Sequence, residues 1–96
     1  MARRHFLISY DISDDKRRTK IFNTLSSNGD HVQFSVFLCQ LNPIELARLR
    51  AVLHPLINTA EDQLLILDLG KVHYDQPLPM ETIGQPYVPP VRTMIV

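Results

Sequence analysis

The residues best suited to chemistry lie close together near the N-terminus. Residues 10–20 contain three carboxylates and four basic side chains, namely Asp11, Asp14, Asp15, Lys16, Arg17, Arg18 and Lys20. Carboxylate oxygens are ligands for Mg²⁺, and clustered cations attract phosphate groups. The segment is therefore a candidate site for chemistry on a phosphate ester.

Asp11 is the candidate metal ligand, and Mg²⁺ is the expected ion. Asp11 ends a run of alternating apolar residues, on the strand face opposite Tyr10. Because Mg²⁺ usually takes one or two protein carboxylates, a twofold axis near Asp11 would supply a pair from two chains. Such an ion would activate water and neutralise charge on a scissile phosphate. The alternative is a strand-end carboxylate that accepts hydrogen bonds from the backbone of the following turn.

Arg18 is expected to differ from its basic neighbours. It lies at helical spacing (i, i+3, i+4, i+7) from three apolar residues, Ile21, Phe22 and Leu25. An arginine on this apolar stripe points inward and needs a partner, for which Asp11 is the nearest candidate.

The remaining charged residues of the segment are expected at the exposed start of the same helix. Lys16, Arg17 and Lys20 face outward and either bind an anion or form an ordinary solvated helix face. Asp14 and Asp15 fit the first positions of the helix, where the helix dipole favours negative charge.

A short pattern of strands and helices must position these residues. The sequence predicts a strand over 5–12, a helix from 13–15 to Asn28-Gly29, two strands within 30–41 broken near Phe34-Ser35, a helix from Asn42-Pro43 to Pro55, and a strand over 63–69. This order predicts an α+β fold with a ferredoxin-like βαββαβ core over residues 1–72. Both helices would then cover one face of an antiparallel sheet.

The other face of the sheet is expected to be covered by a second copy of the chain. Leu7, Leu65 and Leu67 point to that face, and a chain of 96 residues has nothing left to cover it. A sheet-to-sheet homodimer would bury these leucines. Residues 73–96 form a Pro-rich extension with a short strand over 92–96, which is expected to pack on the partner subunit.

Composition excludes several classes of protein. The net charge is zero, but residues 1–50 carry eight basic and five acidic side chains (+3), and residues 51–96 carry two and five (−3). No apolar run approaches the roughly 20 residues that span a bilayer, so no membrane segment is expected. The single cysteine, Cys39, excludes an internal disulfide and fits a cytoplasmic location.

Three further polar residues are not assigned to the site. Cys39 is expected in the core, and His31 on the surface. Asp68 interrupts an apolar strand; a rim position or a contact to the C-terminal extension is preferred over a role as a second carboxylate.

Two segments resemble the Cas-two family, the small CRISPR-associated proteins of the spacer-acquisition machinery. They are Tyr10-Asp11-Ile12-Ser13-Asp14-Asp15-Lys16-Arg17-Arg18, and Gly29 followed by Gln33-Phe34-Ser35-Val36-Phe37. The resemblance covers roughly residues 4–72. It implies a ferredoxin-like homodimer, with C-terminal strands exchanged or added across the dimer. It also implies a role in antiviral defence. Many members of the family are described as Mg²⁺-dependent endonucleases that act on RNA or double-stranded DNA.

The resemblance also assigns roles residue by residue. Asp11 matches the metal-linked aspartate of the family, Tyr10 the tyrosine before it, and Arg18 the helix arginine. Lys20 stands where members often have a second basic residue. Ser35 and Phe37 match the Ser-Val-Phe motif. His31 departs from the pattern, because relatives frequently carry Arg there, so a phosphate contact would be weaker or pH-dependent.

Two functions of different classes follow from these assignments. In the first, the protein is a metal-dependent endonuclease in which paired Asp11 residues hold Mg²⁺, water attacks phosphorus, and Arg18 steadies the developing charge. In the second, it is a non-catalytic dimeric adaptor that binds prespacer duplex DNA through Lys16, Arg17 and Lys20 and bridges the subunits of the CRISPR integrase.

A third possibility, a regulatory domain that binds a small molecule, is disfavoured by the basic cluster and by the lack of a Gly-rich ligand loop. The sequence does not distinguish RNA from DNA, since it offers no aromatic stacking platform beyond Phe37.

Overall fold

The computed structural model describes residues 1–89 and has the predicted βαββαβ order. Its elements are β1 (Arg4–Asp11), α1 (Asp15–Ser26), β2 (Asp30–Gln33), β3 (Val36–Leu41), α2 (Pro43–Leu53), a short 3₁₀ turn (His54–Leu56) and β4 (Gln63–Lys71). The strands form one antiparallel sheet in the order β2-β3-β1-β4. The predicted α+β class is confirmed, as is the strand break at Phe34-Ser35.

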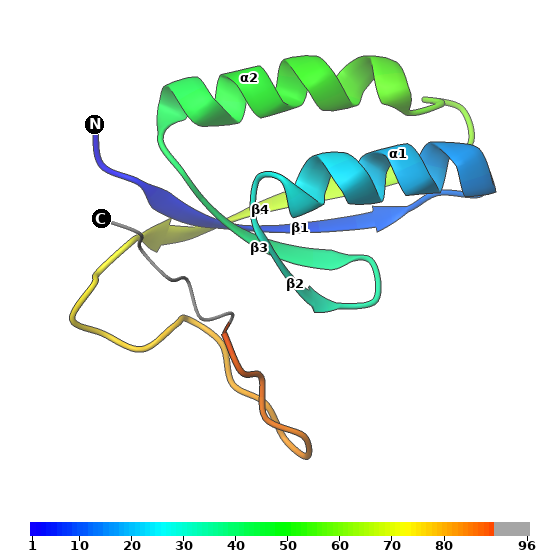
Figure 1. Cartoon of the computed structure of the whole chain (residues 1–96). Coiled ribbons are helices and arrows are strands. Elements are labelled where there is room, and N and C mark those ends of the chain that lie inside the picture. Colours follow the sequence, from blue (N-terminus) through cyan, green and yellow to red (C-terminus); the bar gives the residue numbers. More distant parts are fainter. Residues whose placement is uncertain (90–96) are drawn as a thin grey trace, which may run out of the picture.

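Both helices lie on the same face of the sheet (Figure 1). Their buried side chains, Ile21 and Leu25 of α1 and Leu46, Leu49 and Leu53 of α2, pack against the inward-facing residues of β1 and β3. Burial of these apolar side chains is the main stabilising contribution to the fold.

Local capping interactions fix where each helix begins. The Asp14 side chain accepts a hydrogen bond from the Arg17 amide at 2.9 Å, which makes Asp14 the N-cap of α1. Asn42 and Glu45 form a reciprocal capping box at the start of α2, with Pro43 in the first turn. The predicted helix starts are therefore confirmed.

The face of the sheet away from the helices is apolar and partly open. Leu7 of β1 is in register with Leu38 on one side and Leu67 on the other, so these three side chains share that face. Leu65 and Leu67 of β4 are 47% and 44% exposed. Both faces of β4 were expected to be covered, but within residues 1–89 only its Leu64 and Ile66 side chains are packed against the core. The sheet-to-sheet homodimer remains a prediction.

The C-terminal extension leaves the sheet after Val72, whose amide donates to the Arg3 carbonyl at 3.0 Å. Residues 73–89 contain no helix or strand, as the prolines predict, and they run on the side of the sheet opposite the helices (Figure 1). The strand predicted over 92–96 lies outside the described residues. Within residues 1–89 no helix combines the length and hydropathy needed to cross a bilayer.

Candidate functional site

Asp11 is the last residue of β1 and its side chain is exposed. Its backbone is in register with Gln63 of β4. Among residues 1–89 no hydrogen bond or ion pair reaches the Asp11 carboxylate. The alternative interpretation, a carboxylate satisfied by the following turn, is therefore wrong. The Ser13 amide of that turn donates instead to Asp62 at 3.2 Å.

Asp62, in the loop before β4, holds this turn in place. One carboxylate oxygen accepts from the amide and hydroxyl of Ser13, and the other accepts from the Asn58 amide at 2.9 Å and from Arg17 Nε at 2.8 Å. The Asp62 side chain is 0% exposed. The hydrogen bond from Arg17, with further bonds from the Asn58 and Ser13 amides, holds the pKa of Asp62 well below its usual range.

Arg17 was expected to face outward, with a role in binding nucleic acid. The predicted orientation is wrong. Its guanidinium is half-buried and donates to Asp62, and it also reaches Glu61 at 3.0 Å. The hydrogen bond to Asp62 raises the pKa of Arg17. A buried carboxylate requires a charged partner, and Arg17 is placed to supply it, so its cation is already neutralised within the chain.

Arg18 turns back toward the loop between β1 and α1. Its guanidinium donates to the Ile12 carbonyl at 3.4 Å and to the carboxylate of Asp15, one helical turn earlier. The expected pair with Asp11 is therefore wrong, because Asp15 is a nearer partner on the same helix. The side chain is 32% exposed, so the guanidinium remains accessible beside the residue that follows Asp11.

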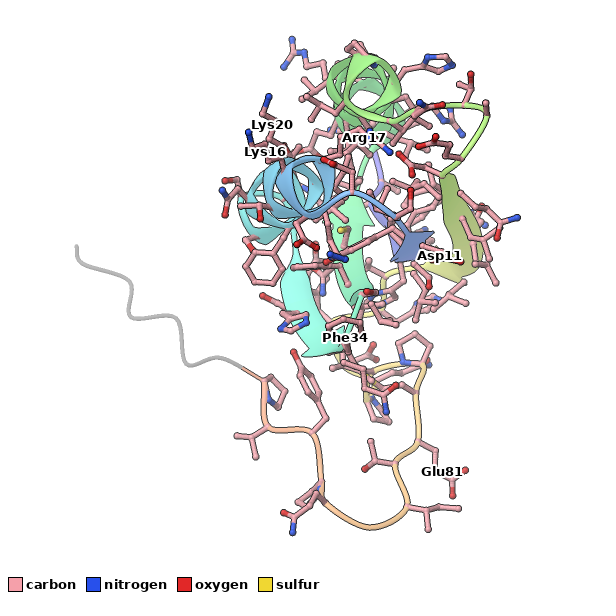
Figure 2. The ribbon with its side chains drawn as sticks, turned by 90° about the vertical axis from the view of Figure 1, so that its right-hand side faces the viewer. Asp11, Lys16, Arg17, Lys20, Phe34 and Glu81 are labelled. Carbon is pink, nitrogen blue, oxygen red and sulfur yellow. The ribbon has the colours of Figure 1, made fainter. Side chains whose placement is uncertain are left out.

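Lys16 and Lys20 lie together on the exposed surface of α1, as predicted (Figure 2). They are four residues apart and therefore share one face of the helix. Within the described part of the chain neither side chain has an acidic partner. These two lysines are the free cations of the basic segment.

Tyr10, Ser35 and Phe37 support the site from within. Tyr10 and Phe37 are 7% and 0% exposed, and their ring centroids are 6.4 Å apart in the core. The Ser35 carbonyl accepts a hydrogen bond from the Tyr10 amide at 3.1 Å. Phe37 is therefore unable to stack on a base, and the exposed aromatic ring at this end of the sheet is Phe34, at 85%.

The three residues left outside the site behave as expected. Cys39 is buried, and burial raises the pKa of its thiol to about 11. His31 is exposed, with its ring against those of Phe22 and Phe37. Asp68 is at the rim, where it binds Arg4 at 2.9 Å.

The predicted metal site can be compared with the carboxylates that the structure brings together. No group of three or more His, Cys, Asp or Glu side chains in residues 1–89 comes together to hold a metal. Asp11 nevertheless presents two carboxylate oxygens that make no bond within that range, and such oxygens are ligands for Mg²⁺. Asp11 is therefore a single candidate ligand, and metal binding stays a prediction.

Comparison with known proteins adds a consistent result. The model of the family described as "CRISPR associated protein Cas2" matches residues 4–76. The chain is 34% identical over 91 residues to the "CRISPR-associated endoribonuclease Cas2" of Geobacter sulfurreducens, covering 95% of each protein. It is 42% identical over 66 residues to the "CRISPR-associated endonuclease Cas2 2" of Thermus thermophilus, covering 69% of this chain and 73% of that protein.

Solved structures have the same fold. A hypothetical protein from Thermus thermophilus matches 81% of this chain and 96% of its own, with a TM-score of 0.69 and 38% identity. Streptococcus pyogenes Cas2 matches 83% of this chain and 99% of its own, with a TM-score of 0.68. At 24% identity the second similarity concerns the fold alone.

Proposed function

The chain belongs to the CRISPR-associated Cas2 family, and from this premise we propose that it is a metal-dependent endonuclease. It would hydrolyse phosphodiester bonds of RNA or double-stranded DNA during spacer acquisition and antiviral defence. The observation that carries the proposal is the exposed Asp11 carboxylate, which makes no bond within residues 1–89 although Ser13 and Arg17 beside it are both bonded to Asp62. The relatives named endoribonuclease and endonuclease support the same activity.

The proposed site is completed by a second copy of the chain. Leu65 and Leu67 expose apolar surface on the sheet face that also carries Asp11, which supports a homodimer through that face. A twofold axis near the end of β1 would bring two Asp11 carboxylates together, and Mg²⁺ needs few protein ligands beyond such a pair.

Each side chain of the site has a separate task in the proposed mechanism. Asp11 holds the cation, and Mg²⁺ when bound would lower the pKa of water and neutralise charge on the phosphate. Arg18, anchored on the Ile12 carbonyl, offers a guanidinium to the phosphate oxygens as their charge grows. Lys16 and Lys20 attract the backbone of the nucleic acid.

The direct test is cleavage by the Asp11→Asn variant. Loss of the carboxylate charge should reduce Mg²⁺-dependent cleavage of RNA or duplex DNA by about 100-fold or more, because the metal would no longer be held. Asp14→Asn is the matched control, since Asn caps a helix as well as Asp does and the fold is kept. Full cleavage by Asp11→Asn would assign the activity to another site.

A second candidate function is the non-catalytic adaptor that binds prespacer duplex DNA and bridges subunits of the CRISPR integrase. The observation that favours it is the pair of exposed lysines on α1, Lys16 and Lys20, which lack acidic partners in the described residues. In this function Asp11→Asn would leave duplex binding intact.

The cytoplasmic location expected from the single cysteine remains a prediction.

A further inference from the structure

His5, near the start of β1, is buried without a hydrogen-bond partner for one of its ring nitrogens. The residue is 6% exposed, and its Nδ1 atom makes no hydrogen bond within residues 1–89. A buried polar atom of this kind is unusual in a folded protein, because it loses its bonds to water and gains none in return. The proposed nuclease site does not use His5, since Asp11 lies at the other end of β1.

A β-bulge opens a cavity beside His5. The register between β1 and β4 shifts between His5 and Phe6, so that Leu69 is an extra residue in β4. Gly70, in register with His5, has φ of 102°, which favours glycine, and a Cβ atom placed there would meet nothing within 4 Å. The cavity has a volume of about 280 Å³, which is large enough for a metal ion with water ligands.

The C-terminal extension brings a second imidazole to this cavity. His73 and Gln76 line it together with His5. The Gln76 amide donates to the His73 carbonyl at 3.1 Å and closes a tight turn. Pro77 and Pro79 also line the cavity and restrict the backbone that follows the turn. Burial, and then the charge of a protonated His73, lower the pKa of His5, which is consistent with two neighbouring rings.

The composition of the cavity wall favours a transition-metal ion. Neutral imidazole is a good ligand for Zn²⁺, whereas Mg²⁺ prefers oxygen ligands. Among the described residues no carboxylate lines the cavity, which disfavours Mg²⁺ and Ca²⁺ there. Lys71 also lines it, but this residue is exposed and its ammonium can stay in water. With two imidazole ligands, the Gln76 side-chain oxygen and water are available to complete a four-coordinate ion.

We propose that His5 and His73 bind a Zn²⁺ ion, which fastens the start of the C-terminal extension to β1. Figure 1 shows the extension leaving the end of β4 that lies beside the start of β1. Such an ion stabilises the folded chain, because the unfolded chain does not bring the two histidines together. The site is structural and independent of the proposed nuclease activity.

The experiment measures zinc binding by the full chain, without an affinity tag and stripped of metal with EDTA before dialysis. All proteins carry Asp11→Asn, which removes the candidate ligand of the nuclease site. Isothermal titration of this parent with Zn²⁺ should give one ion per chain, and titration with Mg²⁺ should give none. His73→Gln and His5→Asn should each weaken zinc binding about ten-fold or more, since loss of a ligand costs at least as much as loss of an outer-shell partner.

The matched control is the double variant His31→Gln with His54→Gln. It removes the other two histidines of the chain, both of which are exposed, and should leave zinc affinity unchanged. Zn²⁺ at about ten times its Kd should raise the melting temperature of this control by about 5 °C, and that of His73→Gln much less. Because His73 is exposed, His73→Gln keeps the test decisive if His5→Asn fails to fold.

A spectroscopic readout identifies the ligands directly. With Cu²⁺ in place of Zn²⁺, electron paramagnetic resonance should show coupling to two imidazole nitrogens in the parent and to one in His73→Gln. Equal zinc affinity of the parent and His73→Gln would overturn the proposal, as would loss of binding in the His31→Gln, His54→Gln control. Coupling to two nitrogens that persists in His73→Gln would also overturn it, by assigning the ion to other residues.

Discussion

Asp11 and Asp62 border the same turn at the end of the sheet, and the protein uses them in opposite ways. Asp62 is buried and bonds to Ser13, Asn58 and Arg17. Asp11 is exposed and its carboxylate has no partner within residues 1–89. One carboxylate thus builds the scaffold, and the other is left available for a ligand.

The basic residues of α1 divide in the same way. Arg17 is neutralised by Asp62 and Glu61, whereas Lys16 and Lys20 point to solvent. Charge that holds the loop is therefore separate from charge that can attract a phosphate backbone. Proximity in sequence to a motif therefore does not make a residue part of its chemistry.

The largest expected effect is on stability, from replacing each aspartate by alanine. Asp62→Ala removes the acceptor of the Ser13 and Asn58 amides and leaves Arg17 with Glu61 as its acidic partner, so the melting temperature should fall by about 5 °C or more. Asp11→Ala removes no hydrogen bond and should leave the melting temperature unchanged or slightly higher. Thermal unfolding followed by circular dichroism measures both, and equal losses would remove the distinction between the two aspartates.

A smaller effect is expected on the salt dependence of duplex binding. Each lysine that contacts a phosphate contributes about 0.9 to the slope of log K against log salt concentration, so Lys16→Ala with Lys20→Ala should flatten the slope by about two. Arg17→Ala should leave the slope as it is, although it lowers stability. If Arg17→Ala flattened the slope and the double lysine variant did not, the division of charges would be reversed, with Arg17 as the residue that contacts phosphate.

The smallest expected effect concerns acid stability. Asp62 has a pKa below that of an unfolded aspartate, about 3.9, so its ionised form stabilises the folded state. This contribution is complete well above pH 4 and is lost as the pH falls below it. The difference in unfolding free energy between the natural protein and Asp62→Asn should be constant from about pH 6 to 8 and narrow below about pH 4. Urea unfolding at each pH provides the measurement, and a gap that widens in acid would contradict the role of Asp62.

The fold could be predicted from the sequence because its determinants are local. Alternation of apolar residues marks β1, and Asn42, Pro43 and Glu45 mark the start of α2 through their capping chemistry. The position of Asp11 at the end of β1, on the strand face opposite Tyr10, followed from the same alternation. Such patterns need only neighbouring residues.

The partners of the charged side chains could not be predicted in the same way. Arg17 and Asp62 are 45 residues apart, and only the folded chain brings them together. Arg18 follows several acidic residues in sequence, and helical geometry selected Asp15 over Asp11. Phe34 was placed correctly at a strand break, but its exposure depended on the turn, since most aromatic residues in such segments are buried.

The central claim is that Asp11 supplies one half of a cation site shared by two chains, and the number of ions bound per chain tests it most directly. Titration with Mn²⁺ in place of Mg²⁺, followed by electron paramagnetic resonance and sedimentation, should give one ion per two chains. The same titration of Asp11→Asn should show that ion lost while the dimer remains. One ion bound to each monomer, or unchanged binding by Asp11→Asn, would contradict the account.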